Sequence, residues 1–236
     1  MQLKGLKVAI NIHKIYLPFQ LYFRKRRLYL FYKIFRLAGE KEIKILDVGG
    51  NIFFWKLAER ERLPIPSITI LNILPPSKEE VKECNRLGIK WVVADGRNMP
   101  FNDNSFDIVF SNSVIEHLGD KNSQEQFAKE IRRVGKAYWV QTPNKMFLVE
   151  PHLITPFVHW FLHLLPKKFQ KIMLRYFTVW GLITKPNEEQ CENFLNEVRL
   201  LSFKEMKELF PDANIFYERF LGLKKSLIAV KLLDER

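Results

Sequence analysis

The sequence predicts an α/β fold: a doubly wound, mostly parallel sheet with an antiparallel edge strand, an N-terminal helical arm and an inserted helical cap. Apolar runs of strand length alternate with segments of helix length from residue 43 to residue 141, which is typical of a parallel sheet covered by helices. The chain has 236 residues, 47% of them hydrophobic, enough for one well-buried domain with an appendage but not for two ordinary enzyme domains.

A basic helical arm is expected over residues 1–42. Residues 1–44 hold eleven lysines and arginines against two glutamates, a net charge of +9 out of the +12 of the whole chain. Pro18 divides the arm into a helix near 3–16 and a longer helix near 19–38, which Gly39 ends. One face of the longer helix is basic and carries Tyr22, Lys25, Arg26, Tyr29, Lys33 and Arg36. The opposite face is apolar, interrupted by Arg24 and Arg27, and carries Phe23, Leu30, Phe31, Ile34, Phe35 and Leu37.

Three interpretations of the arm are open. It docks its apolar face on the domain and leaves its charges in solvent, it contacts an anionic membrane surface peripherally, or it binds nucleic acid. Nucleic acid is the least favoured partner, because the rest of the chain offers no recognised RNA- or DNA-binding module.

The elements of the domain over residues 43–236 follow in chain order. The pattern predicts strands near 43–48, 68–72, 90–94, 106–111 and 137–141, with helices near 53–61, 77–87 and 122–133. The segment 96–104, between the third and fourth strands, is too short for a regular helix. Four prolines separate aromatic and basic pieces at about 145–197, which indicates an inserted helical cap. Ser202 and Glu205 form a capping box for a helix to Phe210, and strands are expected at 214–220 and 226–231.

Polar residues and glycines stand at the ends of three predicted strands. They are Asp47 with Gly49 and Gly50 after the first strand, Asp95 after the third, and Ser111 with Asn112 after the fourth. Ligands of open parallel sheets bind beyond the carboxyl ends of the strands, and glycines let a backbone approach a ligand closely. The sequence therefore predicts one ligand-binding cleft at this edge.

From Lys44 to about Asn144 these motifs resemble the class I S-adenosylmethionine-dependent methyltransferases, particularly the broad group that acts on small molecules. The resemblance implies a Rossmann-like domain and S-adenosylmethionine as the cofactor. It implies that Asp47 and the glycine turn hold the methionine part, and that Asn72 holds the ribose. Asp95 with Gly96 would meet the adenine, and the end of the fourth strand would border the methyl group. The expected cofactor-binding set is Asp47, Gly49, Gly50, Asn51, Asn72, Asp95, Gly96, Arg97, Met99, Ser111 and Asn112.

Two positions depart from the family's pattern. The turn after the first strand usually reads acidic-x-Gly-x-Gly-x-Gly, and only Gly49 matches its glycines. Asn51 tolerates the left-handed conformation, whereas Phe53 does not replace glycine at a close packing point. Asn72 stands where a carboxylate is expected, and an amide lacks the charge that makes carboxylate hydrogen bonds about twice as strong. A modest cofactor affinity is therefore expected.

The expected activity is methyl transfer to a small-molecule acceptor, with an apolar or lipid-linked acceptor favoured by the aromatic residues of arm and cap. Two histidines are candidate general bases, since imidazole titrates near neutrality. His117 follows the fourth strand, and His152 begins the cap with Glu150 beside it to orient the ring. The alternatives are that His117 is a polar residue at a helix start and that His152 is a hinge residue.

Three other functions compete with the enzyme. A non-catalytic scaffold would keep the fold after the altered turn had lost the cofactor, and a membrane-surface binding protein would act through the arm. A nicotinamide-dependent oxidoreductase is disfavoured, because the glycine fingerprint is incomplete and Asp95 would have no role.

Other features exclude further classes. Cys84 and Cys191 stand far apart without a C-x-x-C pair, which indicates structural thiols in a reducing compartment. His159 and His163 have helical spacing but no carboxylate or thiol in the motif, so no metal is expected. No apolar run is long enough to span a bilayer, and the expected location is the cytoplasm, with the arm free to contact a membrane. The sequence does not define the oligomeric state.

Overall fold

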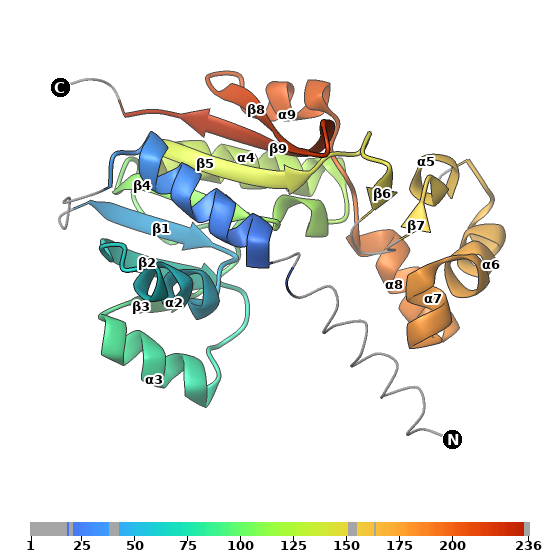
Figure 1. The fold of residues 1–236 in the computed structure, drawn as a ribbon, viewed down its shortest axis with the longest axis horizontal. Helices are drawn as coiled ribbons and strands as arrows, with labels where there is room; N and C mark the ends of the chain where they lie inside the picture. The colour runs from blue at the N-terminus through green and yellow to red at the C-terminus, as the bar shows by residue number, and fades with distance from the viewer. Residues whose placement is uncertain (1–17, 19–20, 38–42, 151–154, 163, 234–236) are drawn as a thin grey trace.

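The computed structural model describes residues 18, 21–37, 43–150, 155–162 and 164–233, which build a seven-stranded sheet (Figure 1). The strand order is β3-β2-β1-β4-β5-β9-β8. The strands are β1 Lys44–Val48, β2 Ser67–Asn72, β3 Lys90–Val93, β4 Phe106–Asn112, β5 Gly135–Pro143, β8 Asn214–Phe220 and β9 Leu223–Lys231. These bounds confirm the predicted strands to within a few residues.

The first five strands are parallel and β9 is antiparallel to both of its neighbours. The register pairs Asp47 of β1 with Ile70 of β2 and with Phe110 of β4, and it pairs Asn72 with Val93 of β3. The carboxyl ends of β1 to β4 therefore lie at one edge. The doubly wound sheet with antiparallel pairing near its end, predicted from the sequence, is confirmed.

Helices cover both faces of the sheet (Figure 1). The helix at residues 21–34, α2 Ile52–Arg60 and α3 Lys78–Leu87 contribute to a core around Trp55, Phe110 and Trp139. On the opposite face, α4 Lys121–Val134 and α9 Phe203–Leu209 pack over Tyr138 and Val140. Between β3 and β4 the described backbone forms turns, as the short 96–104 segment predicts.

The N-terminal helix docks its apolar face on the sheet. Phe23, Phe31 and Phe35 are buried, as predicted. The prediction for Leu30 is wrong, since this side chain is 37% exposed while Leu28 is buried in its place. The helix phase is set by packing on Phe110 and Trp139, which a helical wheel does not contain. The predicted helix at 3–16 and the Gly39 cap lie outside the described residues.

Short strands and helices lie between β5 and α9, where the sequence predicts a helical cap. The described residues of this segment form two short strands and four helices, β6 Val149–Glu150, β7 Thr155–Pro156, α5 Val158–Leu162, α6 Lys167–Phe177, α7 Val179–Thr184 and α8 Glu188–Glu197. It has its own small core of Leu162, Leu174 and Cys191. In Figure 1 the cap lies beyond the end of the sheet toward which β1 and β5 point. Its boundaries as an insertion remain a prediction.

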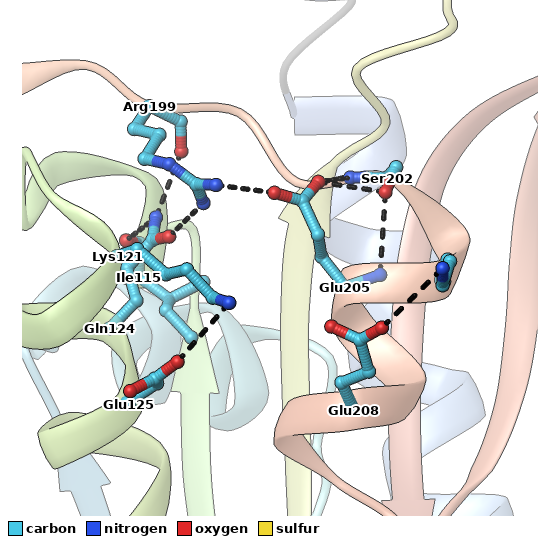
Figure 2. Close-up of polar contacts among 9 residues, drawn as sticks. Ile115, Lys121, Gln124, Glu125, Arg199, Ser202, Glu205 and Glu208 are labelled. Atoms are coloured by element: carbon cyan, nitrogen blue, oxygen red, sulfur yellow. Dashed lines mark hydrogen bonds and ion pairs between the residues drawn. The ribbon is translucent and has the colours of Figure 1, made fainter.

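The chain returns from the cap along α4, where polar contacts fix it (Figure 2). Arg199 donates a hydrogen bond to Gln124 and pairs with Glu205, whose carboxylate also caps α9 through Ser202. Gln124 donates to the carbonyl oxygens of Ile115 and Arg199. The predicted capping box is confirmed. Within the described part of the chain, no helix is long and apolar enough to cross a membrane.

Candidate functional site

A cleft of about 400 Å³ opens at the carboxyl ends of β1, β2 and β3 and beside the short helix η1 (Ile115–His117) that follows β4. Its wall is formed by Val48, Gly49, Leu71, Asn72, Ile73, Ala94, Asp95, Gly96, Arg97, Ser113, Val114, His117, Leu118 and Phe127. Five of the predicted cofactor residues, Gly49, Asn72, Asp95, Gly96 and Arg97, therefore share one cavity. The apolar members Ile73, Val114 and Leu118 were not predicted, because isolated apolar residues in loops carry no distinguishing pattern.

The turn after β1 requires its glycines. Gly49 has a φ of +71°, and a Cβ there would lie 2.6 Å from the Val114 side chain. A Cβ on Gly50 would lie 2.1 Å from the Asp47 carboxylate. Neither position can take a larger residue without a shift of its neighbours, so the backbone of the turn remains bare at the cleft.

Asp47 supports this turn from inside the protein. Its carboxylate is buried and accepts a hydrogen bond from Trp55 Nε1 at 2.9 Å. Burial raises the pKa of Asp47 to about 7, against the Trp55 hydrogen bond, which lowers it. Asp47 lines a smaller hollow of about 80 Å³, together with Gly50, Asn51 and Asn112.

Asn51 begins α2 and does not adopt the left-handed conformation that its side chain would tolerate. Its φ is −143°, and its side chain accepts a hydrogen bond from the Phe53 amide at 3.0 Å. Asn51 is thus a helix N-cap. Phe53 lies in the first turn of α2, where Arg24 of the N-terminal helix stacks over its ring at 4.9 Å.

Asn72 ties the end of β2 to the glycine turn. Its Nδ2 donates to the Gly50 carbonyl oxygen at 2.9 Å, and its Oδ1 accepts from the Leu74 amide at 3.0 Å. Asn72 therefore stabilises the turn that follows β1. The ribose role remains a prediction, since Asn72 also lines the cleft.

Asp95 and Arg97 form an ion pair on the cleft wall. The Arg97 guanidinium contacts both carboxylate oxygens of Asp95, at 2.6 Å from Nη2 to Oδ2, and the Arg97 amide donates to Oδ1. These hydrogen bonds hold the pKa of the Asp95 carboxyl below its usual range. The adenine contact of Asp95 remains a prediction, and Arg97 already occupies both oxygens of this carboxylate.

Two predicted residues lie behind the site. Met99 is buried and donates its amide hydrogen bond to Glu130, and Ser111 is fully buried in β4. Neither lines the cleft or the smaller hollow. Their assignment as cofactor ligands stays a prediction.

Asn112 is held by a residue of the N-terminal helix. Arg27 Nη1 donates to Asn112 Oδ1 at 2.7 Å and to Gln141 Oε1 at 2.5 Å, while Arg27 Nε lies 3.2 Å from Glu218 Oε1. Arg27 and Glu218 are both buried, at 8% and 6% exposure. In the sequence, Arg27 stands out only as a charged residue on an otherwise apolar helix face. A cation at such a position indicates a buried acidic or polar partner, although the sequence does not say which one.

Of the two histidines predicted as general bases, the structure describes His117 but not His152. His117 is exposed at the end of η1 and lines the cleft, with its amide donating to the Val114 carbonyl oxygen. His152 and His163 lie outside the described residues, as does the side chain of His159. Among the described residues, no group of three or more His, Cys, Asp or Glu could hold a metal ion.

Comparisons with known proteins agree with this geometry. Residues 46–137 match the family model described as a methyltransferase domain. A chloroplastic 2-methyl-6-phytyl-1,4-hydroquinone methyltransferase of Oryza sativa subsp. japonica is 27% identical over 96 residues, covering 40% of this chain and 28% of that protein. An uncharacterised protein of Methanocaldococcus jannaschii is 34% identical over 59 residues, covering 25% of this chain and 29% of that protein.

A solved structure shares the fold. The PH0226 protein of Pyrococcus horikoshii OT3 has a TM-score of 0.51 at 14% identity, over 87% of this chain and 86% of that chain. The matches to the two curated proteins span less than a third of their lengths. The match of residues 46–137 to a methyltransferase domain agrees with the predicted resemblance, and the solved structure shares the predicted fold.

Proposed function

We propose that this protein transfers the methyl group of S-adenosylmethionine, bound in the strand-end cleft, to a small-molecule acceptor. The carrying observation is that one cavity of about 400 Å³ gathers Gly49, Asn72, Asp95 and His117 from four separate segments. Pockets for small ligands have volumes of about 300–1,000 Å³. The cavity thus has a suitable size and polar groups spaced along its wall.

The donor set suits an adenosyl ligand. The bare Gly49 backbone leaves room for the methionine part, because any side chain there would meet Val114. The Asn72 amide offers a second donor hydrogen and a second lone pair to ribose hydroxyls beyond the two bonds that it already makes. Asp95 would accept from the adenine amino group once Arg97 yields part of its contact.

The cofactor, when bound, supplies the sulfonium methyl group for an in-line displacement. The chain supplies proximity and orientation. Arg27 fixes Asn112 at the end of β4, where it borders the smaller hollow beside the glycine turn. His117, on the cleft wall, would take the proton of an acceptor hydroxyl, whereas an acidic acceptor would need no base.

An apolar or lipid-linked acceptor is the preferred class. The cap stands at the cleft end of the sheet and exposes aromatic side chains such as Phe157 and Phe161. The described part of the basic arm, in contrast, buries most of its apolar residues in the core. Membrane contact through this helix would therefore rest on its exposed cations, including Lys25 and Arg26.

A non-catalytic scaffold is the second candidate, favoured because polar side chains of the cleft already form hydrogen bonds with other protein groups. Arg97 covers both oxygens of Asp95, and Asn72 is engaged with the turn. A scaffold would retain these contacts and bind no cofactor.

Methyl transfer can be tested with S-adenosylmethionine that carries a tritiated methyl group. The purified protein is incubated with extract of its source organism, and label is counted after partition between water and chloroform–methanol. We expect label in the organic phase, and a loss of at least tenfold for Asp95→Ala. No label in either phase, together with no cofactor binding in a calorimetric titration, would favour the scaffold, and label in water alone would contradict the apolar acceptor.

A further inference from the structure

The outer face of α6 is apolar although it faces solvent. Phe169, Ile172 and Tyr176 are 56%, 39% and 57% exposed. At about 100° per residue, these three positions fall within about 60° of one another around the helix. Leu174, on another side, is fully buried against Cys191 and its neighbours. The helix therefore has a buried side and a separate exposed apolar stripe.

More apolar side chains are exposed in the adjoining segments. Phe161 of α5 and Leu164, in the connection to α6, are 58% and 69% exposed, and Leu182 of α7 is also exposed. Single exposed apolar residues are ordinary, but an accumulation of this kind on one small subdomain marks an interaction surface.

Basic side chains flank the α6 stripe. Lys168 and Arg175 are exposed next to it, and the Arg175 guanidinium lies 5.4 Å from the ring centre of Tyr176. Lys171 points to another partner, since its ammonium pairs with Glu188 and Glu192 of α8. Lys168 and Arg175 thus border the stripe as exposed cations.

The possible occupants of this face are a second copy of the chain, residues 1–17 and a membrane, and they differ in charge. A second copy of the chain would bring its own Lys168 and Arg175 against the same residues. Residues 1–17 of this chain contain three lysines and no acidic residue, so they carry the same sign of charge. Aromatic side chains bordered by cations suit the interface of a bilayer with anionic headgroups.

We propose that Phe169, Ile172 and Tyr176, with Lys168 and Arg175, form a surface that docks on anionic membranes. The cap lies at the end of the sheet toward which β1 and β5 point, the end that carries the cleft (Figure 1). Docking through α6 would place the cleft near the bilayer. Delivery of a lipid-linked acceptor to that cleft rests on the proposed function, whereas the docking itself does not.

The test is flotation of the full-length protein with vesicles of phosphatidylcholine alone or with 30 mol% phosphatidylglycerol. The expected result is at least tenfold stronger partition to the anionic vesicles. F169S/I172S should lose at least tenfold of that partition, and K168E/R175E should remove the preference for anionic lipid. Phe216→Ser is the matched control, because Phe216 is 48% exposed on β8.

Each variant is also checked by circular dichroism and by cofactor titration, which should match the wild type. Equal partition to both vesicles, no partition, or unchanged partition of F169S/I172S would overturn the proposal. A dimer of the wild type that F169S/I172S dissociates in sedimentation velocity would assign the face to a second copy instead. Failure of docking with intact methyl transfer would leave the proposed function standing.

Discussion

Replacing Arg27 with methionine should destabilise the protein and also loosen Asn112 at the smaller hollow beside the glycine turn. Arg27 is the buried cation that joins the N-terminal helix to Glu218 on β8 and to Asn112 at the end of β4. Methionine keeps much of the side chain's length and removes its five donors. The carboxylate of Glu218 and the amide oxygen of Asn112 would then lose a buried partner.

The size of the effect follows from the burial of the pair. Removing one partner of a buried ion pair costs about 3–5 kcal/mol, because the other charge stays buried without compensation. Glu218 keeps Lys225 at 3.1 Å and the Ser226 hydroxyl at 3.0 Å, so the lower end is expected, about 3 kcal/mol. Glu218→Gln in the Arg27→Met background should recover part of this loss.

Urea unfolding followed by circular dichroism measures the free energy, and calorimetric titration with S-adenosylhomocysteine measures the site. Arg26→Met is the matched control, since Arg26 is exposed on the same helix and, among the described residues, donates a hydrogen bond to the Arg219 carbonyl oxygen. It should cost less than about 1 kcal/mol. If Arg27→Met costs no more than Arg26→Met and leaves ligand affinity unchanged, the assigned role of Arg27 is wrong.

Further predictions concern the glycine turn, the buried carboxylate of Asp47 and the Asp95–Arg97 pair. Gly50→Ala would place a Cβ 2.1 Å from the Asp47 carboxylate, so ligand affinity should fall at least tenfold in calorimetry. The folded pKa of Asp47, about 7, exceeds its unfolded value of about 4, so its stabilising contribution is complete below pH 4 and is lost as pH rises through 7. The urea concentration at the unfolding midpoint should fall between pH 5 and pH 8. If Asp47→Asn shows the same fall of the midpoint with pH as the wild type, Asp47 is not the source of the pH dependence. Asp95→Ala should weaken ligand binding about 10- to 100-fold, which corresponds to the loss of a hydrogen bond to a charged group. Arg97→Ala should preserve or tighten binding, because it frees the Asp95 carboxylate. A higher dissociation constant for Arg97→Ala than for Asp95→Ala would contradict the adenine role.

Much of the fold could be predicted, because its signals are local. The apolar runs around Leu46, Ile70 and Val109 identify buried strands, and Ser202 with Glu205 identifies a helix start. The helical wheel predicts the phase of the N-terminal helix only in part. Leu30 is exposed and Leu28 buried because tertiary packing selects the face.

The candidate site was predictable where it depends on strand ends. Asp95 and Gly49 reach one cleft because parallel strands deliver their carboxyl ends to one edge. The contacts of individual side chains were not predictable. Arg27 meets Glu218 only through the folded sheet, and Asn72 directs its amide to the Gly50 carbonyl oxygen, a bond that depends on the exact path of the turn.

The cofactor cleft is the central claim, and calorimetric titration of S-adenosylmethionine into the full chain and into Asp95→Ala tests it most directly. We predict one site per chain in the wild type, with a dissociation constant that rises at least tenfold in the variant. No heat at millimolar cofactor, or equal affinity of the two proteins, would contradict the assignment of this cleft.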